Sequence, residues 1–171
     1  MSTRWQEVLR NSYSSKRRKW SARYIDISKS VASWSKDPRY KVGAVIIGKQ
    51  GQIISQGYNG FPRGMDDYSD RYADSETKRK FVVHAEMNAI YNATLSNTSV
   101  RGATLYVWGL PPCNECTKGI IQSGIKHIVI CAGYDIPDKW EDSFETSKIM
   151  LKECKVSFEM VDLDGNTLYN V

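Results

Sequence analysis

The chain has 171 residues, of which 41% are hydrophobic and 25% charged, a composition typical of one folded globular domain. Its net charge of +5 is compatible with an anionic ligand but does not select one. No apolar run approaches the roughly 20 residues that span a bilayer, and the first 20 residues lack the apolar segment of a secretion signal. We therefore expect a cytoplasmic (intracellular) protein with no membrane partner and no structural disulfides.

The first 19 residues are expected to form a basic N-terminal extension, as a short helix or a loose arm. Its run Lys16-Arg17-Arg18-Lys19 is typical of a solvated surface, so we do not expect a nucleic-acid partner. Residues 20–171 are expected to form a single domain. Its first helix is predicted from apolar residues spaced 4, 3, 4 and 3 apart, a stripe for the core or a subunit contact that ends before Pro38: Trp20, Tyr24, Ile27, Val31 and Trp34.

Strands and helices are expected to alternate after this helix. Two β-rich runs, 42–47 and 52–57, predict an antiparallel hairpin. The polar stretch 57–80 predicts a long loop that is functional or partly disordered. Further strands are expected at 103–108, 126–131 and 156–161, and helices at 84–94, 113–123 and 141–154. This order predicts an α/β fold, with helices on both faces of a mixed sheet.

Residue types that bind metals stand at the starts of two of these helices. His84 begins one helix, and Cys113 and Cys116 begin the next in a Cys-x-x-Cys arrangement. A helix N-terminus favours the thiolate, the form of cysteine that binds zinc. Three protein ligands would leave a fourth position to water, as in catalytic zinc sites, whereas a redox role would use the cysteine pair alone. Candidates for a fourth ligand, which would close a structural site, are His127, Cys131 and Cys154.

Glu86 favours the catalytic interpretation. Residues two apart do not face each other inside a regular helix, but at a helix entry both can point into one pocket. A carboxylate beside a zinc-activated water can carry protons without being a ligand. His-x-Glu at 84–86 followed by Pro-Cys-x-x-Cys at 112–116 is the pattern of zinc deaminases of nucleobases. We therefore predict that Glu86 carries protons during hydrolysis of an amidine carbon, such as C4 of cytosine.

Five stretches of the chain resemble the deoxycytidylate (dCMP) deaminases of eukaryotes and bacteriophages: SKDPRYKVGAVI, GYNGFPRG, HAEMNAI, PCNEC and IIQSGIKHIVI. The resemblance implies a three-layer α/β/α cytidine deaminase-like fold with a mixed five-stranded sheet in the order 2-1-3-4-5. It implies hydrolysis of dCMP to dUMP and ammonia at one catalytic Zn²⁺ per chain, which supplies dUMP for thymidylate synthesis. It also implies a homohexamer that is activated by dCTP and inhibited by dTTP, each bound with Mg²⁺.

The resemblance also suggests ligand-binding residues. Asn59 matches the position that binds the deoxyribose. Lys41 and Arg39 are candidates for the substrate phosphate, and Tyr134 follows a strand at the sheet edge where α/β proteins bind ligands. The effector nucleotides are expected at the GYNGFPRG loop, where glycines permit close approach and arginine matches phosphate: Gly57, Asn59, Gly60, Phe61, Arg63 and Gly64.

Two alternatives remain open on the sequence alone. The same zinc chemistry would serve a deaminase of free cytidine, of a tRNA adenosine or of single-stranded nucleic acid. A nucleic-acid enzyme would need a basic groove with aromatic residues, and only the run 16–20 hints at one. The second alternative is a zinc-stabilised binding module without activity, which would need four protein ligands and would leave Glu86 without a role.

Overall fold

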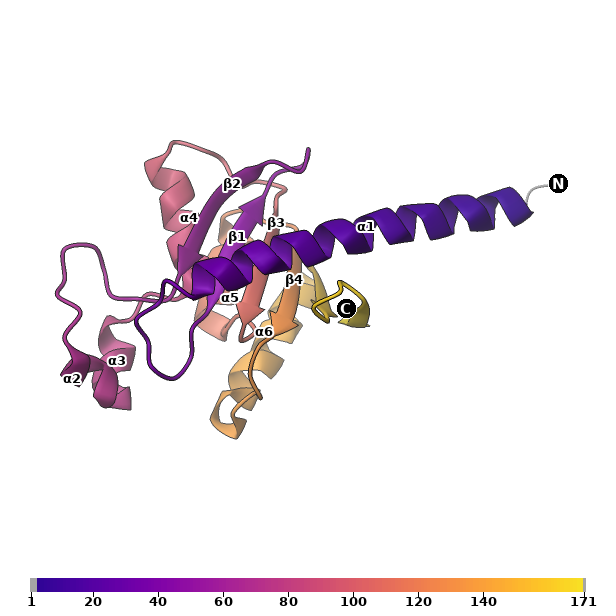
Figure 1. Cartoon of the computed structure of the whole chain (residues 1–171). Helices are drawn as coiled ribbons and strands as arrows, with labels where there is room; N and C mark the ends of the chain where they lie inside the picture. Colours follow the sequence, from indigo (N-terminus) through magenta and orange to yellow (C-terminus); the bar gives the residue numbers. More distant parts are fainter. Residues whose placement is uncertain (1–2, 171) are drawn as a thin grey trace.

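The computed structural model describes the backbone of residues 3–170 and the side chains of residues 15–170. A mixed six-stranded sheet lies between two layers of helices (Figure 1). The strands are β1 (Gly43–Ile47), β2 (Ile53–Tyr58), β3 (Thr104–Gly109), β4 (His127–Ala132), β5 (Ser157–Val161) and β6 (Thr167–Asn170). Their order is β2-β1-β3-β4-β5-β6, with β3, β4 and β5 parallel. The predicted order of the first five strands is confirmed, but the count of five is wrong, because β6 adds an antiparallel edge next to β5.

The helices are divided between the two faces of the sheet. α1 (Thr3–Ala32) covers one face, and α4 (Ala85–Leu95), α5 (Asn114–Gln122) and α6 (Glu141–Glu153) cover the other. The predicted loop 57–80 is wrong in its second half, which contains α2 (Ser69–Ala73) and nearly all of α3 (Ser75–Phe81). A short 3-10 helix, η1 (Asp138–Trp140), precedes α6. Of these short elements, α3 and η1 supply residues that line the pocket described below.

Two apolar cores lie on the two sides of the sheet. All five residues of β1 are buried. Ala44 and Ile46 pack in the core under α4 and α5, while Val45 and Ile47 pack in the core under α1. Because side chains alternate along a strand, burial of both faces requires an unbroken apolar run, as in VGAVII. The three-layer architecture predicted from the sequence is confirmed.

Two glycines allow the helices to lie close to the sheet. A Cβ atom on Gly43 would lie 2.0 Å from the backbone oxygen of Ser28 in α1. A Cβ atom on Gly57 would lie 2.3 Å from the backbone nitrogen of Ala89 in α4. Any side chain at either position would force the facing helix away from the sheet. Gly57, predicted as an effector contact, therefore has a packing role in the fold.

α1 is one continuous helix that crosses the boundary predicted between residues 19 and 20. Residues 3–19 are thus part of a long helix rather than a separate arm, and its N-terminal part extends beyond the sheet (Figure 1). The predicted stripe is only partly in the core, since Trp20 and Trp34 remain 42% and 55% exposed. Although α1 is long, neither it nor any other helix described by the structure is apolar enough to cross a bilayer.

Candidate active site

The three predicted metal ligands converge at the N-termini of two helices. His84 is the N-cap of α4 and Cys113 is the N-cap of α5, with Cys116 in the first turn that follows. Nδ1 of His84 lies 3.4 Å from Sγ of Cys113 and 3.3 Å from Sγ of Cys116. One zinc ion bonded at about 2.0–2.3 Å to each atom could span these separations. Two sulfurs and an imidazole nitrogen are also the donor types that zinc prefers, so the group fits this metal.

The electrostatics of this group favour a deprotonated sulfur. The hydrogen bond with the Cys116 thiol, together with His84, lowers the pKa of Cys113 to about 4. The hydrogen bond with the Cys113 sulfur also raises the pKa of His84. The N-terminal ends of α4 and α5 add partial positive charge at the same point. These effects favour the thiolate form of Cys113, which is the form that binds a cation.

The candidates for a fourth ligand lie elsewhere. His127 begins β4 and lies within hydrogen-bonding distance of Ser157, with 2.6 Å between Nδ1 and Oγ. Cys131 is buried in the core under α1, and Cys154 is exposed at the end of α6. Within residues 15–170, no fourth His, Cys, Asp or Glu joins the metal-type group. These residues therefore do not form the closed structural site that the sequence left open.

Glu86 lies in the pocket next to this group. It is only 3% exposed, and it lines the pocket together with His84 and Cys113. Burial raises the pKa of the Glu86 carboxyl, and the charge of His84 acts in the opposite direction. A carboxyl group with a raised pKa can both accept and donate protons at a neutral working pH. The pocket therefore combines a metal-type group with a proton carrier.

Two cations that the sequence analysis did not single out also line this pocket. Lys78 and Arg79 lie near the end of α3. Nζ of Lys78 lies 2.5 Å from Oδ2 of the buried Asp37. The side chain of Arg79 is exposed and makes no hydrogen bond or ion pair within residues 15–170. The remaining wall is largely apolar and includes Val82, Leu110, Pro111, Trp140 and Phe144.

Comparison with known proteins identifies the family. A family model described as "Cytidine and deoxycytidylate deaminase zinc-binding region" matches residues 18–132, which include His84, Glu86, Cys113 and Cys116. The chain belongs to this family. The resemblance stated from the sequence is confirmed, and the chain is a member of a zinc-dependent deaminase family of hydrolases.

Curated relatives and solved structures agree with this assignment. The deoxycytidylate deaminase of Mus musculus is 38% identical over 146 residues, which cover 81% of this chain and 78% of the relative. The deoxycytidylate deaminase of Homo sapiens is 39% identical over 137 residues, covering 77% and 72%. The crystal structure of dCMP deaminase from the cyanophage S-TIM5 in complex with dCMP and dUMP matches with a TM-score of 0.63 at 27% identity, over 81% of this chain and 93% of that chain.

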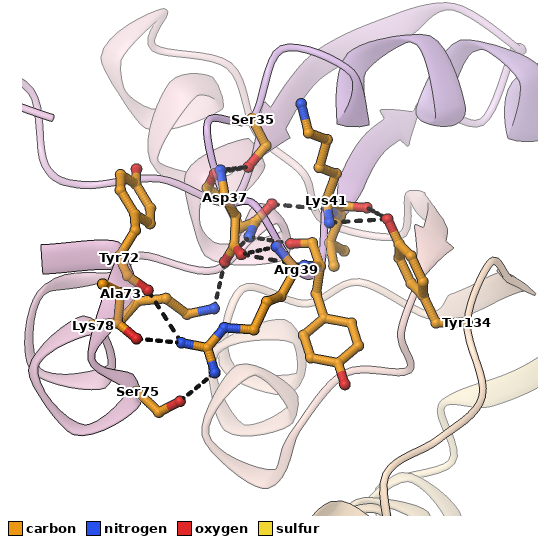
Figure 2. A network of polar contacts seen from close by, with 12 residues as sticks. Ser35, Asp37, Arg39, Lys41, Tyr72, Ala73, Ser75, Lys78 and Tyr134 are labelled. Carbon is orange, nitrogen blue, oxygen red and sulfur yellow. Dashed lines mark hydrogen bonds and ion pairs between the residues drawn. The ribbon is translucent and has the colours of Figure 1, made fainter. Parts of the chain in front are cut away.

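Of the four substrate-binding residues predicted for this deaminase, Asn59 lines the pocket and the other three do not. The guanidinium of Arg39 donates hydrogen bonds at the junction of α2 and α3, to Oγ of Ser75 and the backbone oxygens of Tyr72 and Ala73 (Figure 2). The backbone N–H of Lys41 donates to the Tyr134 hydroxyl at 3.1 Å. These three residues hold the loops around the pocket, and their contact with substrate stays a prediction.

The predicted effector residues of the deaminase lie in three places. Asn59 belongs to the active-site pocket, whereas four residues line a separate hollow: Gly57, Gly60, Phe61 and Arg63. In this hollow Arg63 donates to Oδ1 of Asn92. Gly64 lies outside the hollow, in a turn with a φ of +84°. The hollow stays a predicted effector site.

Local signals in the sequence could have revealed the pocket cations of the deaminase. The Asp74 carboxylate caps α3 by accepting a hydrogen bond from the backbone N–H of Thr77 at 2.6 Å. An acidic first turn and a basic last turn match the helix dipole. These signals indicate a helix that ends just before His84, which would have placed Lys78 and Arg79 beside the predicted zinc ligands.

Proposed function

We propose that this protein hydrolyses dCMP to dUMP and ammonia. The observation that carries the proposal is a single pocket lined by His84 and Cys113 of the metal-type group, by Glu86, and by the cations Lys78 and Arg79. A pyrimidine nucleoside monophosphate has the matching parts, a reactive amidine carbon and a phosphate. The cyanophage dCMP deaminase, whose fold this chain shares, was solved with dCMP and dUMP bound.

The residues of the pocket suggest how protons move in this reaction. Zinc held by His84, Cys113 and Cys116 would supply Lewis acidity, which brings the pKa of a bound water into the neutral range. Glu86 accepts a proton from the water that adds to C4 and transfers it to the adjacent ring nitrogen. Glu86 then carries the second proton to the amino group, which leaves as ammonia while the C4 carbonyl forms. The buried position of Glu86 suits both transfers.

The substrate phosphate is assigned to Arg79 and Lys78. A guanidinium presents paired N–H groups that match phosphate oxygens, and Arg79 has no competing partner within the described residues. Lys78 already pairs with Asp37 but keeps two further donors. Arg39 and Lys41, the cations predicted from the sequence, do not line the pocket and are the weaker assignment. An unphosphorylated nucleoside would leave Arg79 unused, which favours dCMP over cytidine and deoxycytidine.

The test is ammonia release by the zinc-loaded protein from dCMP, deoxycytidine, cytidine and a cytosine-containing oligonucleotide. We expect kcat/KM for dCMP to exceed that for either nucleoside by about a hundredfold, since two charged hydrogen bonds are lost without the phosphate. A kcat/KM for the nucleosides equal to that for dCMP would contradict the phosphate assignment. Oligonucleotide turnover with a steep salt dependence would replace the proposal with a nucleic-acid deaminase.

We further propose that dCTP activates and dTTP inhibits the enzyme, each bound with Mg²⁺ at the hollow around Arg63. Phe61 of the hollow stacks on Tyr72 of α2 with ring centroids 4.2 Å apart, and Arg39 ties α2 to the turn beside the pocket. A ligand in the hollow would thus contact elements that support Lys78. In Arg63→Glu, dCMP turnover should persist while both effector responses disappear. Retention of both responses would contradict this location.

We also propose that the protein is a homohexamer and that its dUMP supplies thymidylate synthesis. Exposed aromatic rings around the hollow offer apolar surface for self-association: Trp34, Tyr58 and Tyr91. Light scattering of the zinc-loaded protein should give six times the 19.5 kDa chain mass. A monomer at micromolar concentration would contradict the assembly but not the chemistry.

A further inference from the structure

Asp37 is a buried acid beside the pocket whose two carboxylate oxygens have different partners. It lies in the turn between α1 and β1, and its side chain is 1% exposed. Oδ1 accepts hydrogen bonds from the backbone N–H groups of Arg39 at 2.9 Å and Tyr40 at 3.2 Å. Oδ2 accepts from Nδ2 of Asn59 at 3.2 Å and from Nζ of Lys78 at 2.5 Å (Figure 2). One oxygen therefore shapes the turn, and the other holds two residues that line the pocket.

These contacts fix the orientation of the Asn59 amide. Its Oδ1 accepts from the backbone N–H of Val42 at 2.8 Å, and its Nδ2 donates both to Asp37 and to the backbone oxygen of Tyr40 at 2.8 Å. A reversed amide would place its NH₂ against an N–H donor and its oxygen against two acceptors. Both N–H groups are thus used within the protein, and only a lone pair of Oδ1 remains for a ligand. The amide can accept a hydrogen bond from a ligand hydroxyl but cannot donate one.

The same carboxylate neutralises Lys78 and fixes its ammonium group. Lys78 is on α3, 41 residues further along the chain, and its side chain is 15% exposed. The ion pair and the Arg39 contacts with Ser75 attach the N-terminal and C-terminal parts of α3 to the turn that contains Asp37. The lysine is therefore held in place before any ligand binds.

We propose that Asp37 is a positioning residue of the substrate site, which orients the Asn59 amide to accept the sugar hydroxyl and holds Lys78 for the phosphate. The inference rests on the proposed function, because dCMP has one free sugar hydroxyl, at C3′, and one phosphate. Asp37 itself contacts neither the reacting carbon nor the proton carrier in this assignment. Its removal should therefore raise KM and weaken recognition of the hydroxyl, with little change in kcat.

Asp37→Asn tests the proposal. The new amide oxygen can still accept hydrogen bonds from the backbone N–H groups of the turn, but the new NH₂ would face the side-chain donors of Asn59 and Lys78 and could not accept from them. Asp162→Asn is the matched control. Asp162 also accepts backbone N–H groups with Oδ1 and an asparagine NH₂ with Oδ2, at 2.8 Å from Asn166, but it does not line the pocket. The substrates are dCMP and 2′,3′-dideoxycytidine 5′-monophosphate, which lacks the C3′ hydroxyl. Zinc content is measured for each variant.

The wild type should prefer dCMP over the dideoxy analogue by at least about tenfold in kcat/KM. Asp37→Asn should raise KM for dCMP by about tenfold or more, keep kcat within about threefold and lose most of the preference. Asp162→Asn should match the wild type. If the single variant does not fold, the double variant Asp37→Asn/Lys78→Gln replaces it, because it leaves no unpaired buried charge. The double variant should also lose the preference for dCMP over the dideoxy analogue.

An unchanged preference in a folded Asp37 variant would overturn the positioning role. A fall in kcat that is equal for both substrates would also overturn it, because a purely structural defect would have that effect. If the wild type itself releases no ammonia from dCMP, the proposed function fails, and this inference fails with it.

Discussion

At the scale of single residues, a substitution of Glu86 should remove turnover without removing zinc. Glu86 lines the pocket but is not one of the three grouped metal ligands. Glu86→Gln keeps the shape of the side chain and removes its ability to carry protons. We expect a normal zinc content and a kcat lower by about a thousandfold or more, as for loss of a general acid–base group. Metal analysis and ammonia release on the same sample check this, and near wild-type turnover would contradict the assignment.

Of the two residues assigned to the substrate phosphate, Arg79 gives the more direct test, because its side chain has no other partner within the described residues. Arg79→Gln should lower kcat/KM for dCMP by about 10- to 100-fold, since it removes a charged hydrogen-bond donor, and leave deoxycytidine turnover unchanged. Lys80→Gln is the matched control, because Lys80 is adjacent, exposed and paired with Glu76 outside the pocket. Equal losses in both variants would mean that only the general positive charge of α3 matters.

At the scale of elements, the contact between α1 and the sheet depends on a missing side chain. Gly43→Ala would place a carbon 2.0 Å from a backbone oxygen of α1, and backbone atoms cannot move aside like a flexible side chain. We expect a loss of about 2 kcal/mol or more in the free energy of unfolding, measured by urea denaturation. Gly60→Ala is the control, since its Cβ would meet only the Tyr58 ring at 3.6 Å. Equal stability of the two variants would contradict this packing.

A polar cluster that joins α1 to β4 and β5 should make stability depend on pH. His127 lies 3.5 Å from Glu159, which also pairs with Arg17 at 2.5 Å. Burial, and then the charge of Arg17, lower the pKa of His127. The unfolded chain therefore binds a proton more readily than the folded chain. The stabilisation is complete above the ordinary histidine pKa of 6.5 and is lost as the pH falls through the folded value.

Comparison of the wild type with His127→Gln isolates this contribution, because every other titrating group is present in both proteins. Urea denaturation at about pH 7.5 and about pH 5.5 should show a larger loss of stability for the wild type than for the variant. The same loss in both proteins would mean that His127 does not titrate differently on folding.

At the scale of the whole molecule, local patterns predicted most of the fold and the chemical centre. The alternation of strands and helices predicted five strands and a mixed sheet with helices on both faces, because the strands are apolar and the turns contain glycine. The order of these five strands was implied by the resemblance to dCMP deaminases, and the structure confirms it. The motifs His-x-Glu and Pro-Cys-x-x-Cys identified four residues that the fold brings into one place, since each motif begins a helix at the same side of the sheet.

Two kinds of feature were not predicted from local patterns: contacts between residues distant in sequence, and elements without buried apolar residues. The guanidinium of Arg39 donates to backbone oxygens 33 and 34 residues further along the chain, contacts that no local pattern encodes, and its contact with the substrate phosphate stays a prediction. Lys78 and Arg79 were missed because α3 is short and has no buried residue, so it lacks an apolar stripe. The sixth strand was not predicted because it is exposed along its whole length and has no buried apolar residues. The dipeptide Asp164-Gly165 before it is nevertheless typical of a turn.

The most direct test of the central claim is the reaction of dCMP with the zinc-loaded protein in ¹⁸O-labelled water. The account predicts ammonia and dUMP in equal amounts, with one labelled oxygen at C4 of the product, and no product from Glu86→Gln on the same time scale. Absence of dUMP, or dUMP without the label, would contradict hydrolytic deamination at this pocket.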